Sequence, residues 1–268
     1  MNNDYVLGYA SNEMKRLQIQ ALLFESSAKN SLIKAGLRPG MKCMDVGCGI
    51  GNVSKLMSDM VGNKGTVLGT DIEKKYVKYC NNNIKSKNIK FVQDNILQTN
   101  ISETFDLVYS RLMFVHLKDK LKAIKSMMQF TKKNGTVIIQ ELDHAPSSWL
   151  SYPNKPCVEH LRKIYVKLIK KTGGDPLSGR KLYELFLDEG LKTELHCDVP
   201  ILQMNQKPFN ELGWRFAFSL KPHILSNNIM TKPQFEKLFD ELKQISKDNM
   251  CFVTYARLFT VFGKKTKS

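Results

Sequence analysis

The chain has 268 residues, 42% of them hydrophobic, which is enough for one large core or a core with an inserted subdomain. Its formal net charge is +16, so a polyanionic partner has to be considered. Only 7 of the 41 basic residues are arginines, the residue type favoured for reading phosphates and bases, and the lysines are spread along the chain. We expect a solvated lysine-rich surface, with a nucleic-acid-binding face as the alternative.

No segment approaches the roughly 18 consecutive apolar residues of a membrane span, and the N-terminus lacks the pattern of a signal peptide. A cytoplasmic location is therefore expected. The six cysteines include no C-x-x-C pair and no zinc-ligand spacing, so we expect free thiols and no metal site.

In chain order, residues 12–35 have helical periodicity, and Pro39-Gly40 precedes the first strand. Short β-rich runs then alternate with helical segments, a pattern typical of βαβ units and a parallel sheet. The strands are expected at 42–46, 66–70, 89–93, 105–109 and 136–140, and the helices at 52–60, 74–85 and 118–130. Because parallel strands end at one edge of a sheet, we expect the polar residues that end these strands to meet there. They are Asp45, Asp71, Asp94, Ser110, Arg111 and Glu141.

The amino-acid composition changes after Asp143, where prolines, a tryptophan and a basic helical segment appear. Helices are expected at 159–171, 180–189, 209–220 and 232–247, and a final antiparallel pair of strands at 193–199 and 252–262. A structureless connection as long as 204–248 is implausible, so it is expected to belong to a cap. The predicted organisation is an entry segment 1–35, a cofactor-binding core 36–144, cap insertions 145–180 and 204–248, a core helix and strand 181–203, and a final strand with tail 249–268.

The most informative motif joins Asp45 to three glycines at alternate positions, Gly47, Gly49 and Gly51, with a second acid, Asp71, at the next strand end. Glycine lets the backbone approach a ligand, and an acid can accept both hydroxyl protons of a ribose. The dinucleotide fingerprint G-x-G-x-x-G does not fit, because Asn52 stands where its third glycine belongs. The motif resembles that of the class I S-adenosylmethionine-dependent methyltransferases. That resemblance implies a Rossmann-like α/β fold, with a seven-stranded, mostly parallel sheet, helices on both faces and a helical cap.

The resemblance also implies roles for particular residues. The turn from Asp45 to Gly51, Cys48 included, would hold the methionine end of S-adenosylmethionine, with S-adenosylhomocysteine as the product. Asp71 would bind the ribose, and Ile72 would pack on the adenine. Asp94 would accept from the adenine amino group, with Asn95 and Ile96 lining that pocket. Arg111, after the fourth strand, would touch the cofactor, whereas Asp106 is expected to be structural.

A second resemblance lies in the N-terminal segment. Tyr5-Val6-Leu7-Gly8, Glu13, Arg16-Leu17 and Gln20 resemble the entry segment of a bacterial and archaeal small-molecule methyltransferase group related to the ubiquinone and menaquinone C-methyltransferases. The implied role is cofactor binding by Tyr5, near the sulfonium, and by Arg16 or Gln20, near the carboxylate. The alternative is an amphipathic helix that packs on the sheet, with Glu13 and Arg16 as a surface pair.

The segment Ser110-Arg111-Leu112-Met113 lacks the N/D-P-P-Y sequence of enzymes that methylate exocyclic amines, which counts against nucleobase methylation.

Positioning supplies much of the acceleration of methyl transfer, and a base is needed only where the acceptor loses a proton. His144 and His116 are the candidate bases, although a lone histidine is more often structural. Cap aromatics such as Trp149, Tyr165 and Phe216 either line an acceptor site or form the core of the cap. The sequence thus predicts methyl transfer to a small organic acceptor; the alternatives are an RNA or protein methyltransferase, or a cofactor-binding protein without methyl transfer.

Overall fold

The computed structural model describes residues 11–266, and the chain divides into two compact units. Of the described residues, unit 1 takes 11–24, 142–177 and 198–258, and unit 2 takes 25–141, 178–197 and 259–266.

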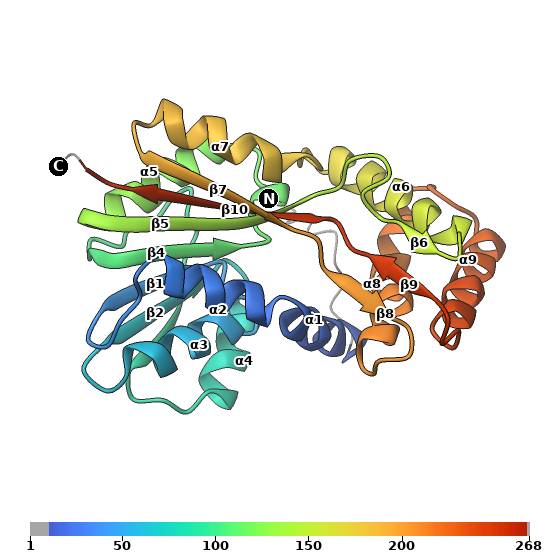
Figure 1. Ribbon diagram of the computed structural model, residues 1–268, viewed down its shortest axis with the longest axis horizontal. Helices are drawn as coiled ribbons and strands as arrows, with labels where there is room; N and C mark the ends of the chain where they lie inside the picture. Colours follow the sequence, from blue (N-terminus) through green and yellow to red (C-terminus); the bar gives the residue numbers. More distant parts are fainter. Residues whose placement is uncertain (1–10, 267–268) are drawn as a thin grey trace. The chain divides into compact units, whose positions relative to one another are not determined.

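Unit 2 is built on a seven-stranded sheet with the strand order β3-β2-β1-β4-β5-β10-β7 (Figure 1). Its five leading strands pair in parallel, with Val46 opposite Thr70 of β2 and Ser110 of β4. These strands therefore end at one edge of the sheet. The strands are β1 (Lys42–Val46), β2 (Thr66–Asp71), β3 (Ile89–Gln93), β4 (Phe105–Arg111), β5 (Thr131–Asp143), β7 (Lys192–Asp198) and β10 (Arg257–Lys264).

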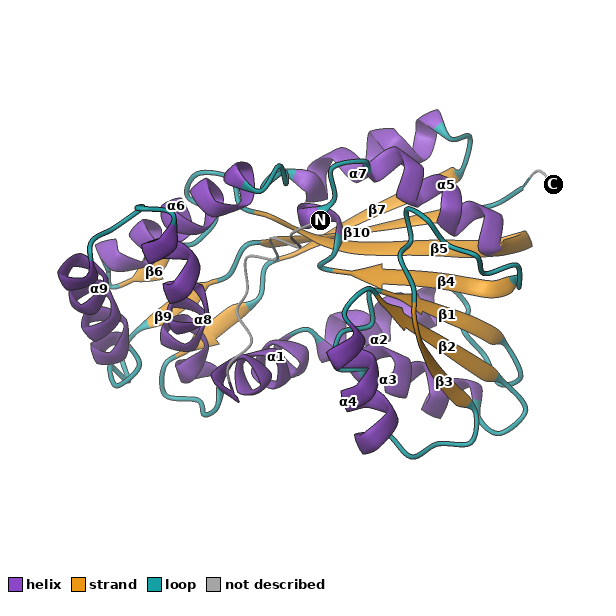
Figure 2. Cartoon of the chain, turned by 180° about the vertical axis from the view of Figure 1, so that it is seen from behind, coloured by secondary structure: helices purple, strands orange, loops and turns teal. Residues whose placement is uncertain are grey.

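Helices cover both faces of this sheet, because alternate strand residues point to opposite sides. On one face, Cys43 and Leu107 pack with α2 (Glu25–Lys34) and α3 (Asn52–Val61). On the other face, Met44 and Val108 pack with α5 (Lys120–Phe130) and α7 (Ser178–Asp188). The helix α4 (Lys74–Asn83) adds Val77 and Cys80 against Phe91 of β3. Both faces are therefore buried, as a parallel sheet requires; Figure 2 shows these helices from behind.

The turn from β1 to α3 owes its shape to glycine. Gly51 has φ +80°, a left-handed conformation that other residues rarely adopt, and it is the N-cap of α3. A Cβ added there would lie 2.5 Å from Ile84 Cδ1 and 3.0 Å from Cys80 Sγ. The backbone of this turn can therefore pack against α4 only because no side chain intervenes.

Unit 1 combines four helices with a three-stranded antiparallel sheet of order β6-β9-β8. Asn12 of α1 and Arg215 of α8 join their helices through Arg215 Nη1 to Asn12 Oδ1 at 2.8 Å and Asn12 Nδ2 to the Arg215 carbonyl at 3.0 Å. The sequence of α9 begins with a capping box of Thr231 and Gln234. The elements are α1 (Ser11–Leu23), α6 (Pro156–Lys171), α8 (Leu212–Ser226), α9 (Lys232–Ile245), β6 (Ser151–Tyr152), β8 (Ile201–Gln203) and β9 (Phe252–Thr254). Two 3₁₀ turns, η1 (Phe114–His116) in unit 2 and η2 (Phe209–Glu211) in unit 1, complete the described elements.

The predicted Rossmann-like α/β fold is confirmed, and two predicted elements need correction. The single helical segment at 12–35 is two helices, α1 and α2, separated at Phe24. The single strand predicted at 252–262 is two strands in different sheets, β9 in the small sheet and β10 in the large one. Neither break has a local sequence signal such as proline or glycine, so periodicity alone merged the elements.

Within the described residues, none of the helices combines the length and apolarity needed to cross a bilayer. No group of three or more potential metal-ligating side chains is found among residues 11–266. The six cysteines all have free thiols.

Replacing Gly51 by alanine should destabilise the protein more than the same change at Gly40. Both glycines have a left-handed φ, +80° and +87°, so each substitution costs about 1–2 kcal/mol of backbone strain. Only Gly51 also faces crowded side chains, which adds about 1–3 kcal/mol. Urea unfolding should therefore show the larger loss for Gly51→Ala, and equal losses would contradict the packing described for this turn.

Candidate functional site

The carboxylate of Asp71 connects the ends of β1 and β2. Its Oδ2 accepts from the Gly49 amide at 2.8 Å, and its Oδ1 accepts from the Glu73 amide at 2.9 Å. The Cys48 amide adds a bond to the Thr70 carbonyl at 2.8 Å. Burial raises the pKa of Asp71, and these two amide bonds oppose that shift. Each carboxylate oxygen keeps a lone pair, so Asp71 can still accept from two ligand hydroxyls.

Asp45 lies beneath the same turn, near the end of β1. It is almost fully buried, and its Oδ2 accepts from Ser54 Oγ at 2.6 Å. Burial raises the pKa of Asp45 to about 6, although Ser54 and the positive charge of Arg111 both lower it. A cationic ligand group near Asp45 would favour its charged form.

The Gly49 position forms an open cradle. Gly49 has φ +53°, and a Cβ built there would meet nothing within 4 Å, in contrast to the crowded Gly47 and Gly51 positions. Next to Asp71, the apolar side chain of Ile72 is 44% exposed. A turn with room above its backbone and an exposed apolar side chain beside a buried acid fits the adenosine part of S-adenosylmethionine.

Asp94, after β3, has a carboxylate oxygen that the fold leaves unused. Its amide donates to the Asp71 carbonyl at 3.1 Å, which holds the two acids' backbones together. Its Oδ2 is buried without a hydrogen-bond partner in the described part of the chain. Burial also raises the pKa of Asp94. An unsatisfied buried acceptor calls for a donor from outside the protein, such as an amino group.

The residues after Asp94 differ in position. The Asn95 side chain accepts from the Leu97 amide at 3.0 Å and so shapes the loop. Ile96 is buried in the core cluster with Met44 and Phe105. The roles predicted for Asn95 and Ile96 in the adenine pocket stay predictions.

The end of β4 shows local backbone strain. Leu112, directly after Arg111, has φ +57°, and its amide donates to the Gln140 carbonyl at 2.9 Å. Such strain in a residue other than glycine is often stored at functional sites. The Val115 amide in η1 donates to Glu141 Oε2 at 2.9 Å, so a buried carboxylate holds the turn that carries His116. The half-buried His116 therefore lies in the same unit as the acids above.

Cys48 is an unreactive thiol within the glycine turn. Its hydrogen bond with Cys80, together with burial, raises the pKa of Cys48 well above its usual range. The Cys80 thiol also lies 3.3 Å from the Gly49 carbonyl. Only the thiolate form is a strong nucleophile, and the raised pKa keeps Cys48 in its neutral thiol form. The two sulfurs therefore support the turn by packing and hydrogen bonding.

The residues predicted on the first helix belong to unit 1. Arg16 binds Glu13 through two bonds of 2.7 Å and Gln20 Oε1 at 3.1 Å. Arg16 and Glu13 are both buried, so the alternative of a surface pair is wrong. A buried ion pair is weak evidence for stability, because desolvation offsets most of the attraction. Tyr5 lies outside the described residues.

His144 lies in a cluster of aromatic side chains in unit 1. Its ring centre is 5.0 Å from that of Tyr165 and 5.8 Å from that of Trp149. Trp149 stacks on Tyr255 at 5.2 Å, and Tyr165 meets Phe216 edge-on at 4.8 Å. We call these five residues the aromatic cluster. The His144 backbone is fixed by bonds to the Pro176 carbonyl at 2.8 Å and from Arg162 Nη1 at 2.7 Å.

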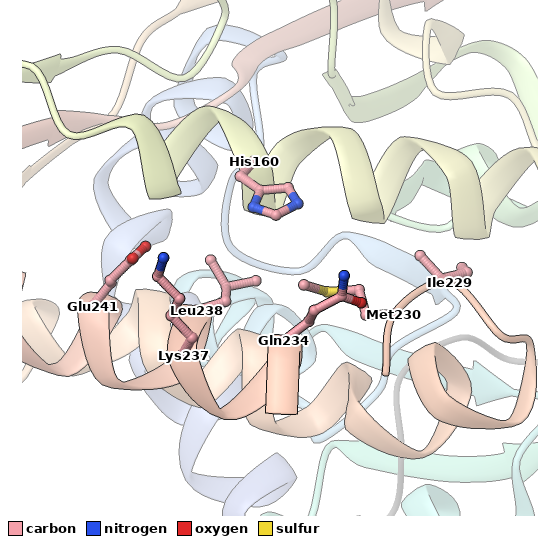
Figure 3. A pocket seen from close by; sticks show the side chains of 7 residues that line it. All are labelled: His160, Ile229, Met230, Gln234, Lys237, Leu238 and Glu241. Carbon is pink, nitrogen blue, oxygen red and sulfur yellow. The ribbon is translucent and has the colours of Figure 1, made fainter. Parts of the chain in front are cut away.

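Unit 1 also contains a surface pocket of about 280 Å³ between α6 and α9. Figure 3 shows His160 on α6 across from the α9 side chains Gln234, Leu238 and Glu241. Within residues 11–266, none of those predicted to bind the cofactor or to act in catalysis lines this pocket. It therefore has no part in the site derived from the sequence.

Three supporting residues were not predicted from the sequence. Ser54 holds Asp45, Glu141 holds η1, and Met113 covers Gly47, where an added Cβ would lie 2.8 Å from its sulfur. Glu141 had been placed at the sheet edge but without this role. The contacts of Glu141 and Met113 span 26 and more residues, and spacing in the sequence carries no signal for them.

Comparison with known proteins agrees with this geometry. A family model described as a methyltransferase domain matches residues 37–190, which is more than half of the chain. Phosphoethanolamine N-methyltransferase 1 of Zea mays is 31% identical over 210 residues, covering 70% of this chain and 40% of that protein. The ubiquinone/menaquinone biosynthesis C-methyltransferase UbiE of Shewanella sediminis is 29% identical over 178 residues, covering 63% of this chain and 65% of that one. The chain thus spans less than two thirds of either relative.

A solved structure shows the same fold. Phosphoethanolamine N-methyltransferase 2 of Haemonchus contortus, in complex with phosphomonomethylethanolamine and S-adenosylhomocysteine, has a TM-score of 0.55 at 15% identity. The similarity covers 94% of this chain and 58% of that one. Because the family model matches more than half of the chain, the chain belongs to the methyltransferase-domain family.

Proposed function

We propose that the protein methylates a small organic acceptor, with the cofactor bound by unit 2 and the acceptor recognised by the aromatic cluster of unit 1. The observation that carries the cofactor half is the Asp71 carboxylate on the Gly49 amide, beside the open Gly49 cradle. S-adenosylmethionine supplies an activated methyl group on a sulfonium, so the protein mainly has to bind, orient and exclude water.

The three strand-end acids Asp45, Asp71 and Asp94 each have a proposed contact. Asp71 accepts from the ribose hydroxyls, and Ile72 packs on the adenine. Asp94 Oδ2, which lacks a partner among the described residues, accepts from the adenine amino group. Asp45, with Arg111 nearby, faces the methionine end, where an ammonium group favours its charged form. The predicted cofactor contacts of Arg16 and Gln20 remain proposals, supported by the resemblance of their helix to related enzymes.

The aromatic cluster supports a small, largely apolar acceptor. Trp149 Nε1 and Ser148 Oγ are buried without hydrogen-bond partners among residues 11–266. An indole N–H can only donate, so it suits an acceptor molecule that carries an oxygen. Both curated relatives carry names of enzymes acting on small molecules, phosphoethanolamine and ubiquinone or menaquinone precursors. These names favour a small acceptor over RNA or protein.

A base is needed only if the acceptor loses a proton on methylation. His144 is the proposed base because its ring lies within the aromatic cluster and its backbone is held at both the amide and the carbonyl. His116, held in η1 through Val115 and Glu141, is the second candidate. His144→Gln tests the choice. If His144 is the base, its loss should lower kcat without weakening cofactor binding.

Asp71→Ala should weaken binding of S-adenosylhomocysteine about 10- to 100-fold, because hydrogen bonds to a charged group contribute roughly 1.5–3 kcal/mol. Isothermal titration calorimetry measures this directly. Asp106→Ala is the matched control, since Asp106 also accepts from a backbone amide, that of Lys42 at 2.8 Å. The control should bind the cofactor normally, whereas undiminished binding by Asp71→Ala would contradict the proposed site.

The affinity for the cofactor should decrease as the pH is lowered below about 6. The folded-state pKa of Asp45, about 6, exceeds its ordinary value of 3.8, so Asp45 becomes neutral as the pH falls through 6. The neutral form loses its attraction for the cofactor ammonium, and affinity should drop by up to about tenfold per pH unit. The Asp45→Asn variant should bind more weakly at pH 7 and lack this step. A step of equal size in the variant would assign it to Asp71 or Asp94, whose pKa values are also raised.

Trp149→Phe should lower kcat/KM for the acceptor while leaving S-adenosylhomocysteine binding unchanged, because it removes the indole N–H but keeps an aromatic ring. Trp214, the second tryptophan, packs on Phe239 outside the aromatic cluster, and Trp214→Phe is the control. The assay follows labelled methyl transfer to phosphoethanolamine, a water-soluble benzoquinol and total RNA. Transfer to RNA alone, with affinity falling steeply with salt, would favour the RNA methyltransferase instead. Labelling of none of these probes, with intact cofactor binding, would count against methyl transfer to this class of acceptor.

A further inference from the structure

The three-stranded sheet of unit 1 has one buried and one exposed face. Side chains alternate between the faces, and Leu202 and Val253 are buried on the inner one. Apart from Gln203 and Thr254, the outer face carries large apolar residues where a solvated sheet face usually carries polar ones. Met250 is 83% exposed, Tyr152 66%, Ile201 53% and Leu150 50%. With Phe252, these residues form what we call the outer face.

Strand pairing places Tyr152 on one side of Phe252 and the exposed Gln203 on the other. Tyr152 and Phe252 are register partners on β6 and β9, and their rings stack at 6.0 Å. Ile201 lies opposite Thr254, whose amide donates to the Leu150 carbonyl at 2.8 Å. Contiguous exposed apolar side chains of this kind mark an interaction surface more often than isolated ones do.

Lysines flank one end of the patch. Because β9 runs antiparallel to β6 and β8, the end of β6, the start of β9 and the end of β8 lie together. The segments at this end carry Lys155, Lys247 and Lys207. Lys155 pairs with Asp248 at 2.8 Å, whereas Lys207 and Lys247 are exposed. The outer face is thus an apolar surface with a positively charged margin.

We propose that the outer face docks onto an anionic phospholipid membrane. Apolar side chains with a tyrosine can enter the headgroup region, while lysines at the margin attract negative lipids. A second copy of the chain is the less suitable occupant, because each copy carries a net charge of +16 and the two would repel. The docking requires no membrane-spanning segment. It goes beyond the proposed function and does not rest on it.

Vesicle flotation tests the docking with the whole 268-residue chain. The protein should float with vesicles of phosphatidylcholine and phosphatidylglycerol, float poorly with phosphatidylcholine alone, and be released by high salt. The double variant Ile201→Thr with Met250→Ser should bind vesicles about tenfold more weakly, because it removes apolar area that docking would bury. The matched control is Ile33→Thr with Leu187→Ser, two residues of unit 2 that are 55% and 49% exposed.

Two double lysine variants distinguish the effect of charge beside the outer face from the effect of the net charge of the chain. Lys207→Glu with Lys247→Glu should reduce flotation, whereas Lys29→Glu with Lys64→Glu, exposed in unit 2, changes the net charge equally and should not. Circular dichroism and S-adenosylhomocysteine titration of every variant check folding and keep the outcome separate from that of the proposed function. Absence of flotation by the wild type, or equal flotation of variants and controls, would overturn the docking. So would a dimer in sedimentation that the outer-face variant abolishes, because a second copy would then cover the patch.

Discussion

The proposed cofactor site depends on the hydrogen bond that the Gly49 amide donates to the Asp71 carboxylate. It joins the ends of β1 and β2, and the left-handed glycines give the turn from β1 to α3 the shape that this bond needs. The Asp94 amide on the Asp71 carbonyl extends the connection to β3. Three neighbouring strands therefore present their acids at one edge of the sheet, each placed by backbone rather than by flexible side chains.

Burial explains why these acids suit a cofactor that carries cationic groups. Asp45, Asp71 and Asp94 all have raised pKa values because desolvation disfavours their charged forms. A bound ligand that supplies hydrogen-bond donors or a positive charge restores the lost stabilisation. The charged forms of these carboxylates are thus less stable in the protein alone than in the proposed complex. This is the physical basis of an affinity that depends on pH.

Much of unit 2 could be predicted from the sequence because its signals are local. The bounds of β1 and β3 match the β-rich runs that predicted them, and the glycine spacing distinguished a methyl-donor site from a dinucleotide site. Unit 1 was less predictable. The break at Phe24 and the division of 252–262 into β9 and β10 depend on which sheet or helix each part packs against. The burial of the Glu13–Arg16 pair likewise depends on distant segments such as Phe216, whose ring lies 5.7 Å from the guanidinium carbon.

In the proposed complex, the strand-end acids of unit 2 anchor the adenosine part of the cofactor. The most direct measurement is a crystal structure of the complex with S-adenosylhomocysteine. We expect the ribose hydroxyls on the Asp71 carboxylate and the adenine amino group on Asp94 Oδ2, with the cofactor lying above Gly49. A cofactor bound elsewhere, such as the pocket between α6 and α9, or one that leaves Asp71 and Asp94 without contact, would contradict it.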